Sequence, residues 1–579
     1  MIAHNLNQRL SFMRAYFLLT MRKKNINRIV FVVFALLTTS SVFSQQEYKL
    51  IKAPQVVYKN SLPVFVRNCW HNLDIEKDTL AGTSLNRAYK EIIKNKKGKE
   101  IIVAVIDTDI DIHHEDLKSA IWINKKEIPN NGIDDDHNGY IDDVNGWNFL
   151  GNKKGESISY ANTESTRLLS RLKNKYGSAY EFKGNKKDST LYIKAINIYK
   201  EDLAQMDTLK KYNVLNISEF RGGSRKMQEI FGKNTFTYYQ IDSLYKKNRK
   251  AEPKIVSSIL SIRNYIRLGL TYEVLKADSL KIIEKYKTTY NPGYYDRYSI
   301  GDNELDLTDK YYGNNNVFKN AKLTYHGTIV SGILGANRSN KIGIEGFSDN
   351  IKIMPILAIP TGGYENDKDV ALAIKYAVDN GAKVINMSFG KTLSANPEWI
   401  KEALQYAEKH NVLVIAGAGN DASDNDLKPF YPIDYDENTR EEFCQNFIKV
   451  GGITFNGDKK FLATFTNYGK KTVDIFAPSF FLKTTDANVG YSYRDGTSMA
   501  SPIVSGVAAL VRSHYPRLTA SEVKQILLDS SVKYDLEVQV PGEKQDTLKP
   551  FKELSKSGGV VNAYNALLMA KEYSKKKKR

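Results

Sequence analysis

Three polar residues of different types stand at the boundaries of apolar segments, and together they carry the groups that nucleophilic catalysis needs. Ser498 precedes a run of small apolar residues in "RDGTSMASPIVSGVAAL", and His326 opens a similar run in "HGTIVSGILGA". Asp107 ends the apolar run "IIVAVID". A serine hydroxyl attacks a carbonyl efficiently only when a base takes its proton and a carboxylate orients that base. The three residues are therefore candidates for nucleophile, general base and orienting acid.

The position of Ser498 at the start of a predicted helix suits a nucleophile. Unpaired backbone N–H groups and the helix dipole stabilise negative charge at such an end. Pro502 is compatible with the helix if it lies in the first turn, where N–H groups have no partner within the helix. Most serines at helix starts are only caps, so the assignment depends on the other two residues.

The elements that carry these residues form an alternating pattern. Apolar, β-branched runs typical of strands buried on both faces occur at 101–107, 351–359, 383–389, 412–419 and 447–453. Amphipathic helical segments lie between several of them, and a later helix begins with a capping box formed by Thr519 and Glu522. The pattern predicts an α/β domain with a parallel sheet and helices on both faces. In such sheets the carboxyl ends of the strands carry the site, as Asp107 would.

Several blocks of the sequence resemble those of the subtilisin-like serine peptidases (subtilases, peptidase family S8). Asp107 lies in "VIDTD" where the family has V-I-D-[ST]-G, and His326 lies in "HGTIVSG" where it has H-G-T-H-V-A-G. Ser498 lies in "GTSMASP", which fits G-T-S-M-A-x-P, and the order Asp, His, Ser is that of the family. The resemblance covers about 67–150 and 320–565. It implies a subtilisin-like fold and a serine endopeptidase that acts on protein or peptide substrates.

The same resemblance implies further site residues. Asn420, in "VLVIAGAGND", takes the place of the side-chain amide that forms an oxyanion hole with the backbone N–H of Ser498. The walls of the pocket for the substrate side chain are Ser388, Phe389 and Gly390 on one side, and Ala416, Gly417 and Ala418 on the other. These small walls predict room for a large apolar side chain.

Three positions depart from the family pattern. Asp109 stands where the family has glycine, which places a second carboxylate two residues from Asp107. Ile329 and Ile503 replace histidines outside the triad, so the chemistry is expected to survive. Because His326 has to be neutral to accept a proton, activity is expected to fall below about pH 6. The chemistry itself is expected to require no cofactor.

An acidic loop has the spacing of calcium ligands. In "NNGIDDDHNGYIDDVNGWNF", positions 1, 3, 5 and 9 of an EF-hand-like loop are Asp134, Asp136, Asn138 and Asp142. Position 12 is Asn145 instead of glutamate. We therefore predict a structural calcium site in this loop, with a solvated Asp/Asn/Gly turn as the alternative.

The chain divides into segments of distinct composition. Residues 1–44, with Met21 as the expected start, have the basic, apolar and small-residue order of a signal peptide, so export to the periplasm or the medium is expected. An uncleaved anchor is the alternative, and no integral membrane span is expected after signal removal. The remaining segments are a lead-in (45–66), a catalytic domain in two parts (67–150 and 321–565), an inserted, mainly helical region (151–320) and a basic tail (566–579).

Most of the net charge of +19 lies in the insertion, since residues 151–300 hold 29 Lys and Arg against 15 Asp and Glu. A charge-laced helical surface is the simplest interpretation, and a site for an unknown acidic partner or a membrane surface is the alternative. A nucleic-acid partner is not expected. The rival functions are a catalytically silent scaffold that binds a partner through the insertion, and calcium-dependent adhesion. Cys69 and Cys444, the only cysteines, are either a disulfide or two free thiols.

Overall fold

A nine-stranded sheet organises the catalytic part of the protein. The computed structural model describes residues 49–51, 62–176, 186–233, 236–267, 270–319, 326–488, 490–544 and 546–577. The strand order is β10-β13-β7-β6-β5-β4-β1-β3-β2, and every neighbouring pair except β10 and β13 is parallel. The strands are β1 (Ile101–Asp107), β2 (Trp147–Asn148), β3 (Ile351–Leu357), β4 (Val384–Met387), β5 (Leu413–Gly417), β6 (Phe447–Ile453), β7 (Ile475–Pro478), β10 (Val532–Lys533) and β13 (Gly559–Val560). Two hairpins accompany the sheet, β8 (Leu482–Asp486) with β9 (Gly490–Arg494) and β11 (Glu537–Gln539) with β12 (Leu548–Pro550).

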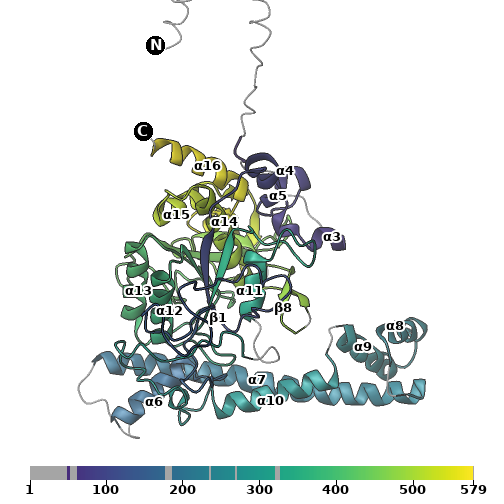
Figure 1. Ribbon diagram of the computed structural model, residues 1–579. Coiled ribbons are helices and arrows are strands. Elements are labelled where there is room, and N and C mark those ends of the chain that lie inside the picture. Colours follow the sequence, from purple (N-terminus) through teal and green to yellow (C-terminus); the bar gives the residue numbers. More distant parts are fainter. Residues whose placement is uncertain are drawn as a thin grey trace, which may run out of the picture. The chain divides into compact units, whose positions relative to one another are not determined.

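Helices cover both faces of this sheet, which confirms the predicted α/β class (Figure 1). One face carries α11 and α14, which pack against each other and against the central strands, and the other carries the packed pair α12 and α13. The helices are α11 (His326–Gly335), α12 (Asp367–Asp379), α13 (Pro397–Lys409), α14 (Thr497–His514), α15 (Ala520–Asp529) and α16 (Ala563–Lys576). The predicted capping box is present at the start of α15.

The alternation of side chains along β1 decides where its last residue points. Ala104 and Ile106 belong to the buried cluster beneath α12 and α13. Because successive strand side chains face opposite sides, Val105 and Asp107 face the helices α11 and α14. Asp107 therefore ends its strand on the face whose two helices carry His326 and Ser498 in their first turns.

The insertion is mainly helical, as predicted. Its helices are α6 (Glu164–Tyr176), α7 (Lys186–Phe231), α8 (Tyr238–Lys247), α9 (Pro253–Arg267) and α10 (Tyr272–Lys287). Figure 1 shows α10 running beside the 46-residue α7, and α8 and α9 close to the far end of α7. A small core of Met227, Ile241, Ile259 and Ile262 joins α7, α8 and α9. This distal end therefore has its own apolar packing.

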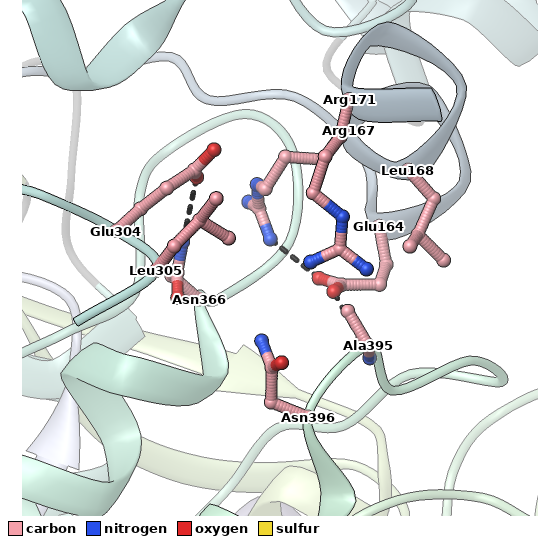
Figure 2. A pocket seen from close by; sticks show the side chains of 9 residues that line it. All are labelled: Glu164, Arg167, Leu168, Arg171, Glu304, Leu305, Asn366, Ala395 and Asn396. Carbon is pink, nitrogen blue, oxygen red and sulfur yellow. Dashed lines mark hydrogen bonds and ion pairs between the residues drawn. The ribbon is translucent and has the colours of Figure 1, made fainter. Parts of the chain in front are cut away.

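The proximal end of the insertion is joined to the catalytic domain by buried charges. Figure 2 shows Glu164 and Arg167 of α6 facing Ala395 and Asn366 of the catalytic part. Arg167 donates to Glu164 Oε2 at 2.5 Å, and Ala395 N–H donates to Glu164 Oε1 at 3.1 Å. Lys391 also pairs with Glu164, at 2.9 Å. The base of the insertion is thus packed against the catalytic core through buried charges.

The short helices α3 (Val64–Arg67), α4 (Ile75–Asp78) and α5 (Leu85–Ala88) precede the first strand. At the other end, residues expected to form a basic tail continue α16 to Lys576, because Ala566, Leu567 and Ala570 are buried. Among the described residues, no helix combines the length and the apolar composition that crossing a membrane requires. Cys69 and Cys444 are both free thiols, and the expected signal peptide lies outside the described residues.

Candidate active site

The carboxylate of Asp107 and the imidazole of His326 form a hydrogen bond. The distance from His326 Nδ1 to Asp107 Oδ1 is 2.7 Å, and the Asp107 side chain is only 1% exposed. The N–H of Thr108 donates to the same Oδ1 at 2.7 Å. Gly327 allows α11 to begin directly on the strand end, since a Cβ there would lie 2.5 Å from the Thr108 carbonyl oxygen. The ring nitrogen Nε2 is therefore the one left to meet a substrate or a nucleophile.

Ser498 is the second residue of α14 and lines the same cavity as Asp107 and His326. The cavity has a volume of about 430 Å³. The Ser498 hydroxyl donates a hydrogen bond to the carbonyl oxygen of Ser388 at 3.1 Å. Among the described residues, no hydrogen bond joins this hydroxyl to His326. Such catalytic hydrogen bonds often form only when substrate is bound, and a rotation about Cα–Cβ changes the direction of Oγ.

Pro502 occupies a different position in the helix from the one expected. Because α14 begins at Thr497, Pro502 is its sixth residue, and its missing N–H would have bonded the Ser498 carbonyl. The hydroxyl of Ser388 donates to that carbonyl at 3.0 Å instead. The proline thus frees an acceptor that fixes the neighbouring wall of the cleft to the start of α14.

Asn420 is oriented by the residue before Ser498. Its Oδ1 accepts hydrogen bonds from Thr497 N–H at 2.8 Å and from Thr497 Oγ1 at 3.0 Å. The Nδ2 group is therefore free to face the cleft. A Cβ at Gly496, whose φ is +132°, would lie 3.5 Å from Asn420 Nδ2 and 3.7 Å from Ser498 N. Asn420 Nδ2 and Ser498 N, the two donors of the expected oxyanion hole, therefore both lie near the same position in the cleft.

Asn386 is a site residue that motif reasoning did not assign. It is fully buried, and its Oδ1 accepts from the hydroxyls of Ser501 and Ser505 on α14, at 2.8 and 2.9 Å. Its Nδ2 donates to Ser388 Oγ at 2.9 Å. This network holds the wall after β4 against α14. In the sequence, the only indication of this role was that Asn386 is a polar residue within an apolar strand.

The two expected pocket walls contribute unequally to the cavity. Ser388, Phe389 and Gly390 all line it. On the opposite side Gly417 lines it together with Gly419 and Asn420, whereas Ala416 and Ala418 are fully buried.

Asp109, the second carboxylate near Asp107, is engaged in a structural ion pair. Its Oδ2 accepts from Lys319 N–H at 2.8 Å, and Lys319 Nζ lies 3.8 Å from Oδ1. Burial lowers the pKa of Lys319, and the Asp109 carboxylate partly offsets that effect. The carboxylate of Asp109 is thus paired with Lys319, whereas that of Asp107 is bonded to His326.

The electrostatic surroundings of His326 favour its protonated form. Burial lowers the pKa of the imidazole, but the facing and hydrogen-bonded carboxylate of Asp107 outweighs this effect, while Arg494 slightly opposes it. The net result is a pKa of His326 above its ordinary value of 6.5.

This shift predicts where activity is lost on acidification. The ring has to be neutral to act as a base, so kcat/KM should be full above the raised pKa and fall about tenfold per pH unit below it. The midpoint is expected above pH 6.5, higher than the sequence alone suggested. The measurement is the pH profile of peptide hydrolysis, with His113→Gln, an exposed histidine, as the unaffected control. A profile that stays flat down to about pH 4 would exclude His326 as the base.

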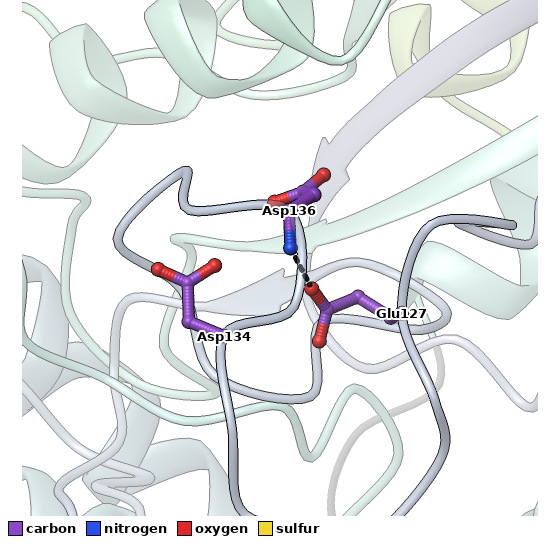
Figure 3. A group of neighbouring side chains, drawn as sticks. All are labelled: Glu127, Asp134 and Asp136. Carbon is purple, nitrogen blue, oxygen red and sulfur yellow. Dashed lines mark hydrogen bonds between the residues drawn. The ribbon is translucent and has the colours of Figure 1, made fainter.

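The acidic loop brings together a ligand set that differs in part from the expected one. Oxygen atoms of Glu127, Asp134 and Asp136 all lie within 4.8 Å of one another (Figure 3). Asn138 and Asp142 make other hydrogen bonds: Asn138 Nδ2 donates to Asp143, and Asp142 accepts from the backbone of residues 131 and 132. Glu127 lies outside the loop motif, so spacing could not identify it.

The protein is thus an α/β protein with a mainly parallel sheet, in which an Asp, a His, a Ser and an amide donor line one cleft. The chain belongs to the Subtilase family (peptidase S8), whose family model matches residues 98–559.

Individual relatives match shorter stretches. The chain is 37% identical over 216 residues to the thermophilic serine proteinase of Bacillus sp. (strain AK1), covering 37% of this chain and 46% of that protein. It is 32% identical over 203 residues to subtilisin DY of Bacillus licheniformis, covering 35% and 68%. The cell wall-associated protease of Bacillus subtilis (strain 168) is 33% identical over 245 residues, covering 42% of this chain and 25% of the relative. The chain thus spans less than half the length of two of these relatives.

A solved structure of proteases from Pseudoalteromonas arctica PAMC 21717 is similar over 42% of this chain and 70% of its own, with 27% identity and a TM-score of 0.33.

Proposed function

We propose that the protein is a serine endopeptidase that hydrolyses peptide bonds in proteins or peptides. The observation that carries the proposal is the 2.7 Å hydrogen bond between His326 Nδ1 and a buried Asp107, which faces the same cavity as Ser498. This bond fixes the tautomer of the ring that leaves Nε2 as proton acceptor. Membership of the Subtilase family supports the same chemistry.

In this mechanism Ser498 Oγ turns from Ser388 O toward Nε2 of His326, gives up its proton and attacks the substrate carbonyl carbon. The Nδ2 group of Asn420 and the N–H of Ser498 donate to the resulting oxyanion. The protonated imidazole then gives its proton to the leaving amine, which breaks the C–N bond and leaves an acyl-enzyme. Water, deprotonated by the same ring, attacks the ester and releases the acid, and the proton returns to Ser498.

A fluorophosphonate probe tests this proposal against the rival of a silent scaffold. The probe should phosphonylate Ser498 Oγ with release of fluoride, and mass spectrometry of the digested protein should place the adduct on the peptide that contains this residue. The unlabelled protein should also cleave internal bonds of an unstructured polypeptide at slightly alkaline pH. A protein that neither reacts nor cleaves would instead support the scaffold.

We also propose that the enzyme is exported, because residues 1–44 have the composition of a signal peptide. The matching relative whose name places it at the cell wall supports this location.

Calcium is proposed as a structural ligand of the cluster formed by Glu127, Asp134 and Asp136. Glu127 is only 6% exposed, and its Oε2 is buried without a hydrogen-bond partner, which is costly unless a cation binds there. Burial raises the pKa of Glu127. The nearest ammonium in the described region, that of Lys126, lies 4.0 Å from Asp136 but is 78% exposed, so it compensates little. Three carboxylates suit a hard cation that prefers oxygen ligands.

Chelation is therefore expected to lower the melting temperature of the protein. Calcium at 100 times its dissociation constant would contribute about 2.7 kcal/mol to the free energy of unfolding. The measurement is thermal denaturation with EDTA and after added Ca²⁺, in a Ser498→Ala background that prevents self-digestion. Glu127→Gln should abolish the calcium-dependent shift, whereas Glu229→Gln, on an exposed helix, should retain it. An equal melting temperature with and without calcium would contradict the site.

A further inference from the structure

The aromatic ring of Phe430 lies between the two walls of the pocket. Phe430 lines the same cavity as the triad. A Cβ added at Gly390, on one wall, would lie 2.3 Å from Phe430 Cε1. A Cβ added at Gly419, on the other wall, would lie 3.1 Å from the same atom. One edge of the ring therefore fills the space that the two glycines leave between the walls.

The ring is held in this place by the loop that carries it. Tyr431 and Lys391 exchange both backbone hydrogen bonds, at 2.8 and 3.1 Å, so the loop pairs with the chain directly after Gly390. Beneath it, Lys449 Nζ donates to the carbonyl oxygens of Phe430 and Pro432 at 3.0 and 2.6 Å. Lys449 is only 3% exposed.

Lys449 Nζ also lies 5.6 Å from the centre of the Phe430 ring, so the side chain packs beneath the ring. A long side chain entering from the cleft would have to displace the ring. Displacing the ring would disturb its loop, which is hydrogen-bonded to the backbone of Lys391 and to the side chain of Lys449.

We propose that Phe430 is the floor of the specificity pocket and restricts it to small side chains at the residue whose carbonyl Ser498 attacks. This inference rests on the proposed peptidase function and deepens it by naming the substrate class: peptides with glycine, alanine or serine at that position. It replaces the expectation from the wall residues alone, which suggested room for a large apolar side chain. Because Phe430 touches the substrate side chain only, it acts on the choice of substrate and not on the reacting atoms.

The test is a set of peptides that differ only at the residue before the cleaved bond, with alanine, leucine or phenylalanine there. For the unsubstituted protein, kcat/KM should be at least about tenfold higher for alanine than for phenylalanine. Phe430→Ala should raise the ratio of phenylalanine to alanine cleavage about 10- to 100-fold, because it opens the floor. Phe430→Leu should change the ratio in the same direction by a smaller factor.

Leu427→Ala is the matched control, because Leu427 belongs to the same loop and is 77% exposed. It should leave the ratio unchanged. Rates are divided by the fraction of protein that reacts with a fluorophosphonate, so partial misfolding of a variant does not alter the comparison.

Two failures are distinguishable. If the unsubstituted protein neither reacts with the probe nor cleaves any peptide, the peptidase function fails. If it reacts and cleaves but prefers phenylalanine, the inference about Phe430 is overturned whatever the variants do. An unchanged ratio in a labelled Phe430→Ala protein would overturn it as well.

Discussion

Replacing Ser498 by alanine is expected to reduce kcat for peptide hydrolysis about 10⁶-fold, because removing the nucleophile disables the whole triad. The substitution removes only an oxygen atom at the second position of α14, so folding and substrate binding should persist. The measurement is hydrolysis of a single peptide substrate by purified protein, together with the KM or the binding constant of the same peptide. Some acceleration over the reaction in water should remain, because the oxyanion donor on Asn420 is untouched.

Two further variants sharpen this experiment. Ser521→Ala, at an exposed serine of α15, should keep full activity. Asn420→Leu alone should cost about 10²–10³ in kcat. The double variant should lose less than the product of the two separate factors, because groups that act as a unit are not additive. Hydrolysis at the original rate by the Ser498→Ala protein would mean that the nucleophile lies elsewhere.

The sequence predicted the elements that carry these residues because each is specified locally. A strand buried on both faces requires a continuous apolar run, so all five predicted strands are present as β1, β3, β4, β5 and β6. The carboxyl end of β1 carries Asp107, and the starts of α11 and α14 carry His326 and Ser498. Small residues in both helices allow close packing, which is also visible in the sequence.

Other parts of the site depend on contacts that no local pattern encodes. Phe430 reaches the pocket from a polar loop, and its ring position depends on Lys449 in a different strand. Lys319 pairs with Asp109 across 210 residues of sequence. In the acidic loop, spacing identified Asp134 and Asp136 but not Glu127, which approaches from an earlier turn. Such pairs become evident only when the fold brings distant segments together.

The insertion is the clearest example of contacts that the sequence did not predict. Its composition, with many lysines and helical periodicity, suggested a helical insertion with a solvated charged surface. Arg297, inside that region, is only 1% exposed and binds two carboxylates, each through two nitrogen atoms. One carboxylate belongs to Asp302, and the other to Asp369 of α12, in the catalytic domain. Composition identifies a charged segment but not which of its charges are buried.

Arg297→Met is therefore expected to reduce the free energy of unfolding by about 3–5 kcal/mol, since removing one partner of a buried pair leaves the other charge uncompensated. Asp369 is completely buried, and its Oδ1 and Oδ2 accept from Arg297 at 2.8 and 2.6 Å. Lys368, also buried, would still pair with Asp302 at 2.8 Å, so the loss should fall mainly on Asp369. The measurement is guanidinium denaturation in a Ser498→Ala background, where the protein cannot digest itself.

The matched control is Lys226→Met on α7, whose ion pair with Glu229 has a similar distance of 2.8 Å but leaves the two side chains 44% and 55% exposed. This variant should change the free energy of unfolding little, because exposed ion pairs contribute little to stability. Adding Asp369→Leu to Arg297→Met should recover part of the loss, because it removes the unpaired charge. Equal destabilisation by Arg297→Met and Lys226→Met would mean that the insertion is not anchored through this pair. A large difference would mean that the buried pair between Arg297 and Asp369 stabilises the catalytic domain from the base of the insertion.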